Sequence, residues 1–269
     1  MDVLYIFNFE EADLPEALRR FRFSLESIAR QNVRICISNN SEVCVRSEIE
    51  DLIPRIAYVH KPYRGLFSRA HGINYGVRTL VESEYFIISD VDLVYRQNHI
   101  ENVRRKMSDA ACPSSPLRLV FWNYNLEPRY RPAWMNRRLL RRFASQSPRE
   151  ESSDYERLMA LPSKGGFAHG NGVIHLESFL RLRGYDEEMI GYGPEDDLFN
   201  TRIGRVNKIV YDDSTDTASI HLWHRRLRMI QHKKNMEIWR KRKACYNTLP
   251  NPSWDDLTAN KNSRTWGEI

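Results

Sequence analysis

The first 89 residues alternate between short apolar runs and longer segments with apolar residues at helical spacing, and this alternation restricts the fold more than any other feature. The apolar runs of strand length fall at residues 3–8, 33–38, 56–59 and 85–89. Amphipathic helices are expected between them, at 14–28, 43–53 and 70–80. A β-α-β-α order predicts an α/β fold with a mostly parallel central sheet flanked by helices on both faces.

The later part of the chain is less regular but contains both kinds of element. Strands are expected at 117–122, 173–176, 209–211 and 219–223. Helices are expected at 134–144, 177–183 and 226–245. Asp13 with Glu16, and Asn98 with Glu101, have the spacing of capping boxes, so helices are expected to begin directly after Asp13 and Asn98.

Length and composition fit one globular unit. The 269 residues are 41% hydrophobic and 28% charged, which is enough to bury a sizeable core. We expect a single domain over 1–245 and a polar C-terminal tail over 246–269. The four cysteines have no C-x-x-C spacing, so a reducing compartment is favoured over a disulfide framework or zinc site. No secretory leader follows Met1, and we therefore expect a cytoplasmic protein.

Asp90 and Asp92 directly follow the buried strand expected at 85–89. Two carboxylates this close repel each other and lose hydration on burial, and a divalent cation such as Mg²⁺ or Mn²⁺ offsets both costs. Ligands of parallel sheets bind outside the carboxyl ends of the strands, where both acids would lie. The alternative is that one acid caps the next helix, for which Asn98 is the better start.

A second acidic cluster, Glu-Asp-Asp at 195–197, follows a Gly-Tyr-Gly-Pro loop at 191–194. The helix dipole favours acids in a first turn, so plain capping is one explanation. Capping does not explain the preceding loop, whose glycines allow close backbone approach and whose tyrosine ring can stack on a sugar face. A functional role requires that the two acidic clusters meet in space.

Two histidines occur on or near the last expected strand, at His221 and His224. A neutral imidazole there can complete a metal site begun by carboxylates, and the alternative is an ordinary structural histidine. Strand alternation places the two on opposite faces, so only one of them is expected to ligate.

These elements together resemble the GT-A glycosyltransferases over roughly residues 1–232. The Asp90-Val91-Asp92 triplet follows the fourth strand, as the Asp-x-Asp signature of that fold does. Residues 191–197 resemble the W-G-G-E-D motif of β-1,4-galactosyltransferases, polypeptide N-acetylgalactosaminyltransferases and chondroitin-polymerase-like enzymes of family 2. The segment 69–76 is similar to the family's Arg-x(4)-Asn-x-Gly helix.

Other positions add to the resemblance or depart from it. His221 falls where these families place a metal-binding histidine, and 227–232 echoes the galactosyltransferase histidine segment, which adds His232 as a third candidate. Tyr192 replaces the tryptophan of the acceptor motif. Asn-Asn-Ser at 39–41 replaces the Asp-Asp or Asp-Gly-Ser that reads uracil in many family 2 enzymes.

The resemblance implies an inverting, metal-dependent transferase that moves a hexose, with galactose or N-acetylgalactosamine favoured, from a UDP-sugar to a saccharide or glycoconjugate hydroxyl. Asp196 would be the general base, and Mn²⁺ or Mg²⁺ would be held by Asp92 and Asp90 with His221 or His224. The implied acceptor-binding residues are Glu195, Tyr192, Gly193 and Asp197. The implied donor-binding residues are Asn8, Asn39, Arg64, Arg69, Asn74, Asp90, Val91 and Asp92.

Lys and Arg are concentrated at 129–149 and 225–243, although the net charge is only +6. Such clusters are either solvated or dock on the inner face of an anionic membrane, where each basic residue contributes about 1 kcal/mol. A lipid-linked saccharide acceptor would suit docking. A nucleic-acid-binding protein would leave both acidic clusters unexplained, so no nucleic acid partner is expected. A nucleotidyltransferase normally carries a glycine-rich phosphate loop, which 8–13 lacks.

Overall fold

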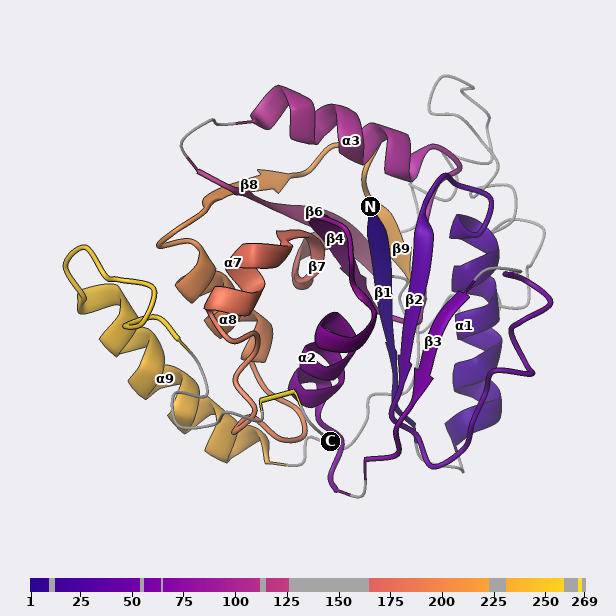
Figure 1. Ribbon diagram of the computed structural model, residues 1–269, viewed down its shortest axis with the longest axis horizontal. Coiled ribbons are helices and arrows are strands. Elements are labelled where there is room, and N and C mark those ends of the chain that lie inside the picture. The colour runs from indigo at the N-terminus through magenta and orange to yellow at the C-terminus, as the bar shows by residue number, and fades with distance from the viewer. Residues whose placement is uncertain are drawn as a thin grey trace.

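The computed structural model describes residues 1–9, 13–53, 56–63, 65–111, 115–125, 165–222, 231–258 and 266–267. Arg64, His224 and the basic segment 129–149, with the helix expected at 134–144, fall outside this part of the chain. Within it, one twisted sheet runs through the middle of the molecule. Helices lie on both sides of the sheet (Figure 1).

The sheet has the strand order β3-β2-β1-β4-β7-β6-β9-β5, with β8 paired to β6. Its first members are β1 (Asp2–Phe7), β2 (Arg34–Asn39), β3 (Ile56–His60), β4 (Tyr85–Ser89) and β5 (Leu93–Val94). The later strands are β6 (Leu117–Asn125), β7 (Gly165–His175), β8 (Lys208–Asp212) and β9 (Ser219–His221). The described helices are α1 (Leu14–Ile28), α2 (Arg69–Leu80), α3 (His99–Ala110), α7 (Leu176–Arg181), α8 (Glu195–Ile203) and α9 (His232–Thr248).

The sheet is mixed, which corrects the expectation of a mostly parallel one. β1 to β4 are parallel neighbours, as the alternating pattern predicts. β7 then pairs antiparallel with both β4 and β6, and β5 pairs antiparallel with β9. The α/β class itself is confirmed. Parallel pairing follows from the alternation over the first 89 residues, and that inference does not extend to the strands after β4.

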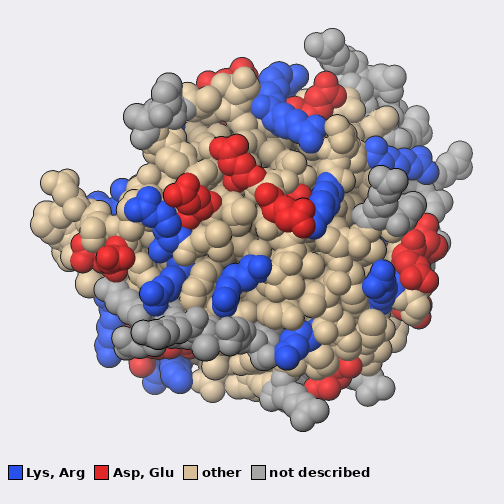
Figure 2. All heavy atoms as spheres, viewed as in Figure 1, with Lys and Arg blue, Asp and Glu red and all other residues tan. Residues whose placement is uncertain are grey.

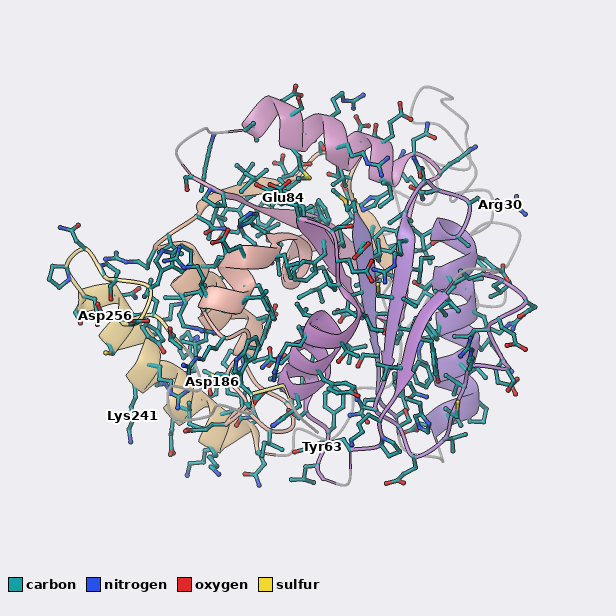
Figure 3. All side chains as sticks on the ribbon, in the orientation of Figure 1. Arg30, Tyr63, Glu84, Asp186, Lys241 and Asp256 are labelled. Carbon is teal, nitrogen blue, oxygen red and sulfur yellow. The ribbon has the colours of Figure 1, made fainter. Side chains whose placement is uncertain are left out.

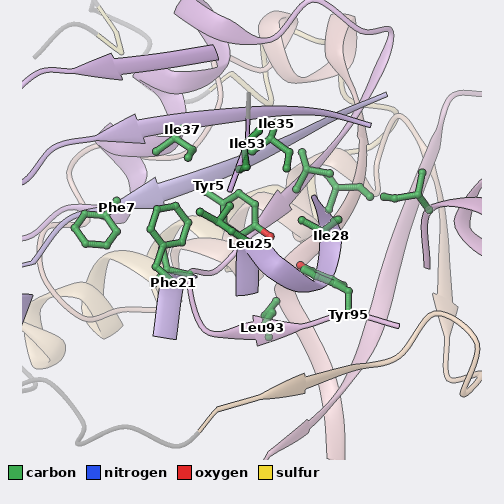
Figure 4. Packing of buried hydrophobic residues seen from close by; sticks show 14 of the residues in the cluster. Tyr5, Phe7, Phe21, Leu25, Ile28, Ile35, Ile37, Ile53, Leu93 and Tyr95 are labelled. Carbon is green, nitrogen blue, oxygen red and sulfur yellow. The ribbon is translucent and has the colours of Figure 1, made fainter. Parts of the chain in front are cut away.

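The core consists of two apolar clusters, one on each face of the sheet. On one face, Tyr5 and Phe7 of β1 pack against Phe21 of α1, with Tyr5 and Phe21 ring centroids 5.4 Å apart (Figure 4). The apolar spacing of α1 predicted that Phe21 faces inward, but not which residues it meets. On the other face, α2 and α8 cover the sheet, and Tyr185 stacks on Phe199 at 4.5 Å. Both clusters hold the strand ends in fixed register.

Residues 43–53 do not form the expected helix but a series of turns. The Asn39 side chain donates to Val43 O at 2.8 Å, and Val45 N donates to the Tyr58 hydroxyl at 3.1 Å. These side-chain bonds hold the start of the segment in a non-helical course. Val45 and Ile49 are nevertheless buried, so the apolar spacing identified the inward residues but not the backbone conformation.

Two helices begin where the capping-box spacing predicted, but without the capping hydrogen bonds on which the prediction was based. α1 and α3 begin directly after Asp13 and Asn98, yet neither side chain makes a capping hydrogen bond in the described structure. A side-chain cap is present at α2, where the Ser68 hydroxyl accepts a hydrogen bond from His71 N at 3.4 Å. This cap fixes the first residue of α2 at the edge of the sheet where β4 ends.

The segment after residue 245 was expected to be a polar tail. α9 continues to Thr248, and Leu257 is fully buried in the cluster beside α2 and α8. Arg202 donates to Leu257 O at 3.3 Å, and the Arg181 guanidinium lies 4.2 Å from the Trp254 ring centre. These contacts attach 246–258 to the rest of the fold, while the domain boundary at 245 stays a prediction.

Charged side chains of both signs are mixed over the face of the molecule in Figure 2, with broad uncharged areas between them. The small positive net charge is therefore not gathered on that face. No helix in the described residues is both long and apolar enough to cross a lipid bilayer.

Gly172 allows β7 to approach β6 closely. Its φ is +126°, and an added Cβ would lie 2.1 Å from Leu119 O. Gly172→Ala should lower the free energy of unfolding by about 2–4 kcal/mol, since the strained φ and the backbone overlap add. Urea unfolding measures this. Gly166→Ala, in the same strand with no atom within 4 Å of an added Cβ, is the control, and an equal loss there would contradict the explanation.

Candidate active site

Arg69, the first residue of α2, is bound to the first acidic cluster. Its guanidinium donates to Asp90 Oδ1 at 3.2 and 2.9 Å and to Gly170 O at 3.1 Å. Asn171 Nδ2 donates to Asp90 Oδ2 at 3.3 Å. Burial would raise the pKa of Asp90, but the Arg69 charge and these hydrogen bonds outweigh it, and the pKa lies below its ordinary value. Asp90 is therefore a fixed anion.

Glu195, the first residue of α8, lies against the same guanidinium. Its Oε1 is 3.7 Å from Arg69 Nη1, and its side chain is buried. Burial and the neighbouring Asp196 charge raise the pKa of Glu195 to about 8, against the opposing effect of Arg69. Glu195 is thus mainly protonated at neutral pH. The two acidic clusters meet in space, with Arg69 between them.

Asp92 and His221 are brought together by the pairing of β5 with β9. Leu93, the residue after Asp92, lies opposite His221 in that pairing, and His221 Nε2 is 3.4 Å from Asp92 Oδ1. Asp92 is buried, whereas the His221 side chain is 28% exposed. Across the described ranges, no three His, Cys, Asp or Glu side chains converge on one point as a metal centre requires. A cation here would take further ligands from a bound molecule or water.

The other predicted donor-side residues fall into two groups. Val91 is buried in the core between the two acids. Asn8 directly follows β1, and within the described structure its buried Nδ2 has no hydrogen-bond partner. A buried amide donor in that state is available to a ligand. Asn8 and Val91 therefore lie at the strand ends where a donor is expected.

Asn39 and Asn74 are fully buried, and their amides are already bonded within the protein. Asn39 Nδ2 donates to the Tyr58 hydroxyl at 2.8 Å, which supports the turn after β2. Asn74 Nδ2 donates to Tyr185 O at 2.9 Å and to Glu187 Oε1 at 2.8 Å. These contacts favour supporting roles for both residues over direct contact with a donor.

The predicted acceptor-side residues point in different directions. Tyr192 is 48% exposed, as a stacking platform would be. Asp196 is half-buried, and its Oδ1 accepts from Asp197 N at 2.7 Å. The carboxylate of Asp197 is turned toward α9, where Oδ2 accepts from Trp239 Nε1 and Lys243 Nζ, each at 2.6 Å. Asp197 is thus bonded to α9, whereas the Asp196 charge lies close enough to Arg69 and Glu195 to raise the pKa of both.

The three histidines considered as metal ligands differ in their positions. His221 lies beside Asp92, and His224 lies outside the described residues. His232 is the first residue of α9, with its ring 5.5 Å from the Tyr192 ring. Of these histidines, His221 is therefore the one beside a predicted metal-binding carboxylate, whereas His232 lies beside Tyr192.

Sequence reasoning missed residues that act on this site from neighbouring elements. Asn171 lies between glycines within β7, and glycine in a strand is a known signal of close backbone approach. In α9, the residues that face the protein recur at helical spacing. That spacing identifies the buried face of the helix, but not the segment against which the face packs. The missed residues are Asn171, Asn235, Trp239 and Lys243.

Comparison of the fold with solved structures gives consistent neighbours at low identity. TarS from S. aureus matches with a TM-score of 0.60 and 12% identity, covering 96% of this chain and 42% of the TarS chain. Its 1–349 portion in complex with UDP matches with a TM-score of 0.58 and 12% identity, over 96% of this chain and 70% of that one. The present chain therefore spans less than half the length of the first of these TarS chains.

Weaker likenesses include the mannosyltransferase PcManGT of Pyrobaculum calidifontis, with a TM-score of 0.49 and 15% identity over 91% of this chain and 61% of that one. No protein-family model matches the chain, and no curated protein matches it in sequence. The chain has the GT-A glycosyltransferase fold, as the sequence motifs predicted.

The raised pKa of Glu195 has a consequence for stability. The folded protein holds this proton more tightly than the unfolded chain, whose Glu pKa is near 4.5, so stability is lost as pH rises through about 8. Glu195→Gln cannot ionise. Wild type should therefore lose stability between about pH 5 and pH 8.5 in a way that the variant does not. The free energy of unfolding of Glu195→Gln minus that of wild type should rise by about 1 kcal/mol or more over this range. Glu177→Gln, at a side chain 72% exposed, is the control for urea unfolding at both values.

Arg69→Met should lower the free energy of unfolding by about 1.5–3 kcal/mol, because it removes the hydrogen-bonded counter-ion of the ionised, partly buried Asp90. Adding Asp90→Asn removes that stranded charge and should recover part of the loss. Chemical unfolding of the two single variants and the double variant measures the coupling. Strictly additive losses would contradict the ion cluster.

Proposed function

We propose that the chain is a glycosyltransferase that moves a hexose from a UDP-sugar to the hydroxyl of a saccharide or glycoconjugate. The observation that carries this proposal is the junction at Arg69, where the end of β4 and the start of α8 meet. In the GT-A fold, these strand and helix ends are where the sequence motifs assign the donor and the acceptor. The TarS neighbour is a complex with UDP, which supports the choice of nucleotide.

On the donor side, Asp90, Val91 and Asp92 would contact the nucleotide, with the buried Asn8 amide as a further donor of a hydrogen bond. Arg69 would act behind Asp90 rather than on the diphosphate, since its guanidinium is engaged by Asp90, Glu195 and Gly170 O. We retain galactose or N-acetylgalactosamine as the favoured sugar, on the resemblance of residues 191–197 alone.

A divalent cation, Mn²⁺ or Mg²⁺, fits the residues at the end of β4. Asp92 offers a buried carboxylate, an oxygen ligand of the kind that suits Mn²⁺ and Mg²⁺, and His221 adds a partly exposed imidazole beside it. Asp90 stands beside them, although Arg69 and Asn171 already donate to both of its oxygens. The cation, when bound, neutralises charge on the departing diphosphate. The protein's part is to hold Asp92 and His221 in register through the β5 and β9 pairing.

On the acceptor side, Asp196 is assigned as the general base and Glu195 as an acceptor ligand. A base must be ionised, and the pKa of Glu195 at about 8 leaves it mainly protonated at neutral pH. A protonated Glu195 donates a hydrogen bond to an acceptor hydroxyl, while Asp196 accepts the proton of the attacking hydroxyl. One base and direct displacement give inversion at the anomeric carbon.

The exposed face of α9 supports a lipid-linked acceptor and peripheral contact with the inner face of a membrane. Lys233, Lys234, Arg240 and Lys241 are exposed on this helix, with Glu237 among them. Anionic headgroups attract such a surface by about 1 kcal/mol per basic residue. A cytoplasmic protein held at the membrane in this way would meet its acceptor there.

The proposed activity is tested with a panel of UDP-hexoses and Mn²⁺, by measuring UDP release with and without EDTA. We expect turnover that EDTA removes. Asp196→Asn should lower transfer by about 10²-fold or more while UDP binding stays within twofold of wild type. Absence of metal-dependent turnover or binding with every UDP-sugar would contradict the transferase, and loss of UDP binding in Asp196→Asn would contradict the acceptor-side role.

The metal assignment predicts a difference between two histidines. His221→Ala should raise the Mn²⁺ concentration needed for half-maximal UDP binding by about tenfold or more, because one of two protein ligands is lost. His232→Ala should leave that concentration unchanged. Calorimetric titration of UDP at several Mn²⁺ concentrations measures both variants, and the opposite pattern would move the ligand role to His232.

A further inference from the structure

The acceptor-side segment 186–197 rests on α9 over much of the length of that helix. Asn235 is buried, and its Nδ2 donates to Ile190 O at 2.8 Å and to Tyr192 O at 3.0 Å. One side chain thus holds the backbone on both sides of Gly191. Because the loop would otherwise leave these carbonyls unpaired beside a helix, Asn235 fixes its course.

Gly193 allows this close approach. A Cβ at this position would lie 2.8 Å from Asn235 Cβ, closer than such atoms pack. Glycine at 193 therefore permits the loop to lie directly on the helix. The Gly-Tyr-Gly pattern has a physical reason in the contact with α9, in addition to any contact with an acceptor.

Asp197 joins the same helix at the other end of the segment. Its Oδ2 accepts from Trp239 and Lys243, and the Lys243 ammonium lies 4.8 Å from the Trp239 ring centre. These charge-assisted bonds bring the first turn of α8 onto α9. Asp197 is the direct neighbour of Asp196, so α9 also restrains the orientation of the assigned base.

A third attachment lies before the loop. Arg242 forms ion pairs with Asp186 and Glu188, the former being fully buried. Asn235, Trp239 and Arg242 follow one another at spacings of four and three residues, which places them on one face of α9. The opposite face is exposed, and Lys241 extends from it away from the molecule (Figure 3).

We propose that α9 is the positioning element of the acceptor site, and that Asn235, Trp239 and Lys243 set how tightly an acceptor saccharide binds. They act through the backbone at 190–192 and through Asp197, and none of them is assigned a contact with the donor. The proposal rests on the proposed transferase function and deepens it. The acceptor affinity is thus decided by α9, which lies about 40 residues further along the chain than the motif at 191–197.

The test compares variants on the two faces of α9. Asn235→Ala and Lys243→Met remove contacts to the loop and to Asp197, Lys243→Arg keeps a cation, and Lys241→Met on the outer face is the matched control. Lactose, cellobiose and chitobiose serve as acceptor probes with the best UDP-hexose. Hydrogen exchange of the amides at 190–197 is measured on the same proteins without substrate.

For Asn235→Ala and Lys243→Met, we expect the acceptor KM to rise about tenfold, the effect of losing one to two hydrogen bonds. The donor KM and UDP affinity should stay within about twofold of wild type. Lys243→Arg should restore most of the acceptor affinity. Lys241→Met should match wild type, because the membrane contact proposed for Lys241 has no part in an assay with soluble disaccharides and no membrane. Exchange at 190–197 should become faster in the first two variants only.

Unchanged exchange at 190–197, or equal losses of donor and acceptor affinity, would overturn the positioning role, since a merely structural effect weakens both sites alike. Failure of wild type to bind UDP would instead contradict the proposed function. The exchange measurement separates the two outcomes because it requires no substrate.

Discussion

The Arg69 guanidinium lies between Asp90 and Glu195, and the site depends on this placement. Two carboxyl groups held near one another in a poorly solvated region raise each other's cost of ionisation. A single cation between them keeps Asp90 ionised, whereas Glu195, more deeply buried and next to Asp196, retains its proton. The two acids beside Arg69 therefore differ in protonation state, because burial and the Asp196 charge outweigh the effect of Arg69 at Glu195, whereas Arg69 and the hydrogen bonds outweigh burial at Asp90.

α2 places Arg69 there because it is anchored at several points. Ser68 caps its first turn, and Asn74, two turns later, bonds to Tyr185 and Glu187. The helix thus connects the parallel half of the sheet with the start of the segment 186–197. α9 supports that segment from the other side, so it is held between two helices that are distant in sequence.

The local chemistry of the site was largely predictable. Asp90 and Asp92 end a buried apolar run, and Glu195 to Asp197 open a helix after a glycine-containing loop, both of which are visible in the sequence. Errors arose where a distant partner decided the outcome. The Asn39 and Tyr58 side chains turned 43–53 away from a helix, and β7 paired antiparallel with β4 and β6 without any local signal. Local patterns report which residues face inward, but not which neighbours they meet.

The sequence by itself determined the α/β class, the four parallel strands up to β4 with helices α1 and α2, and the identity of both acidic clusters. These follow from periodicity and from the few roles that adjacent acids can have. Only the tertiary structure decided that Arg69 joins the clusters, that His221 rather than His232 lies beside Asp92, and that the Asp197 carboxylate bonds to α9. Each of these is a contact between residues tens of positions apart, set by strand register and helix packing, and no local spacing encodes it.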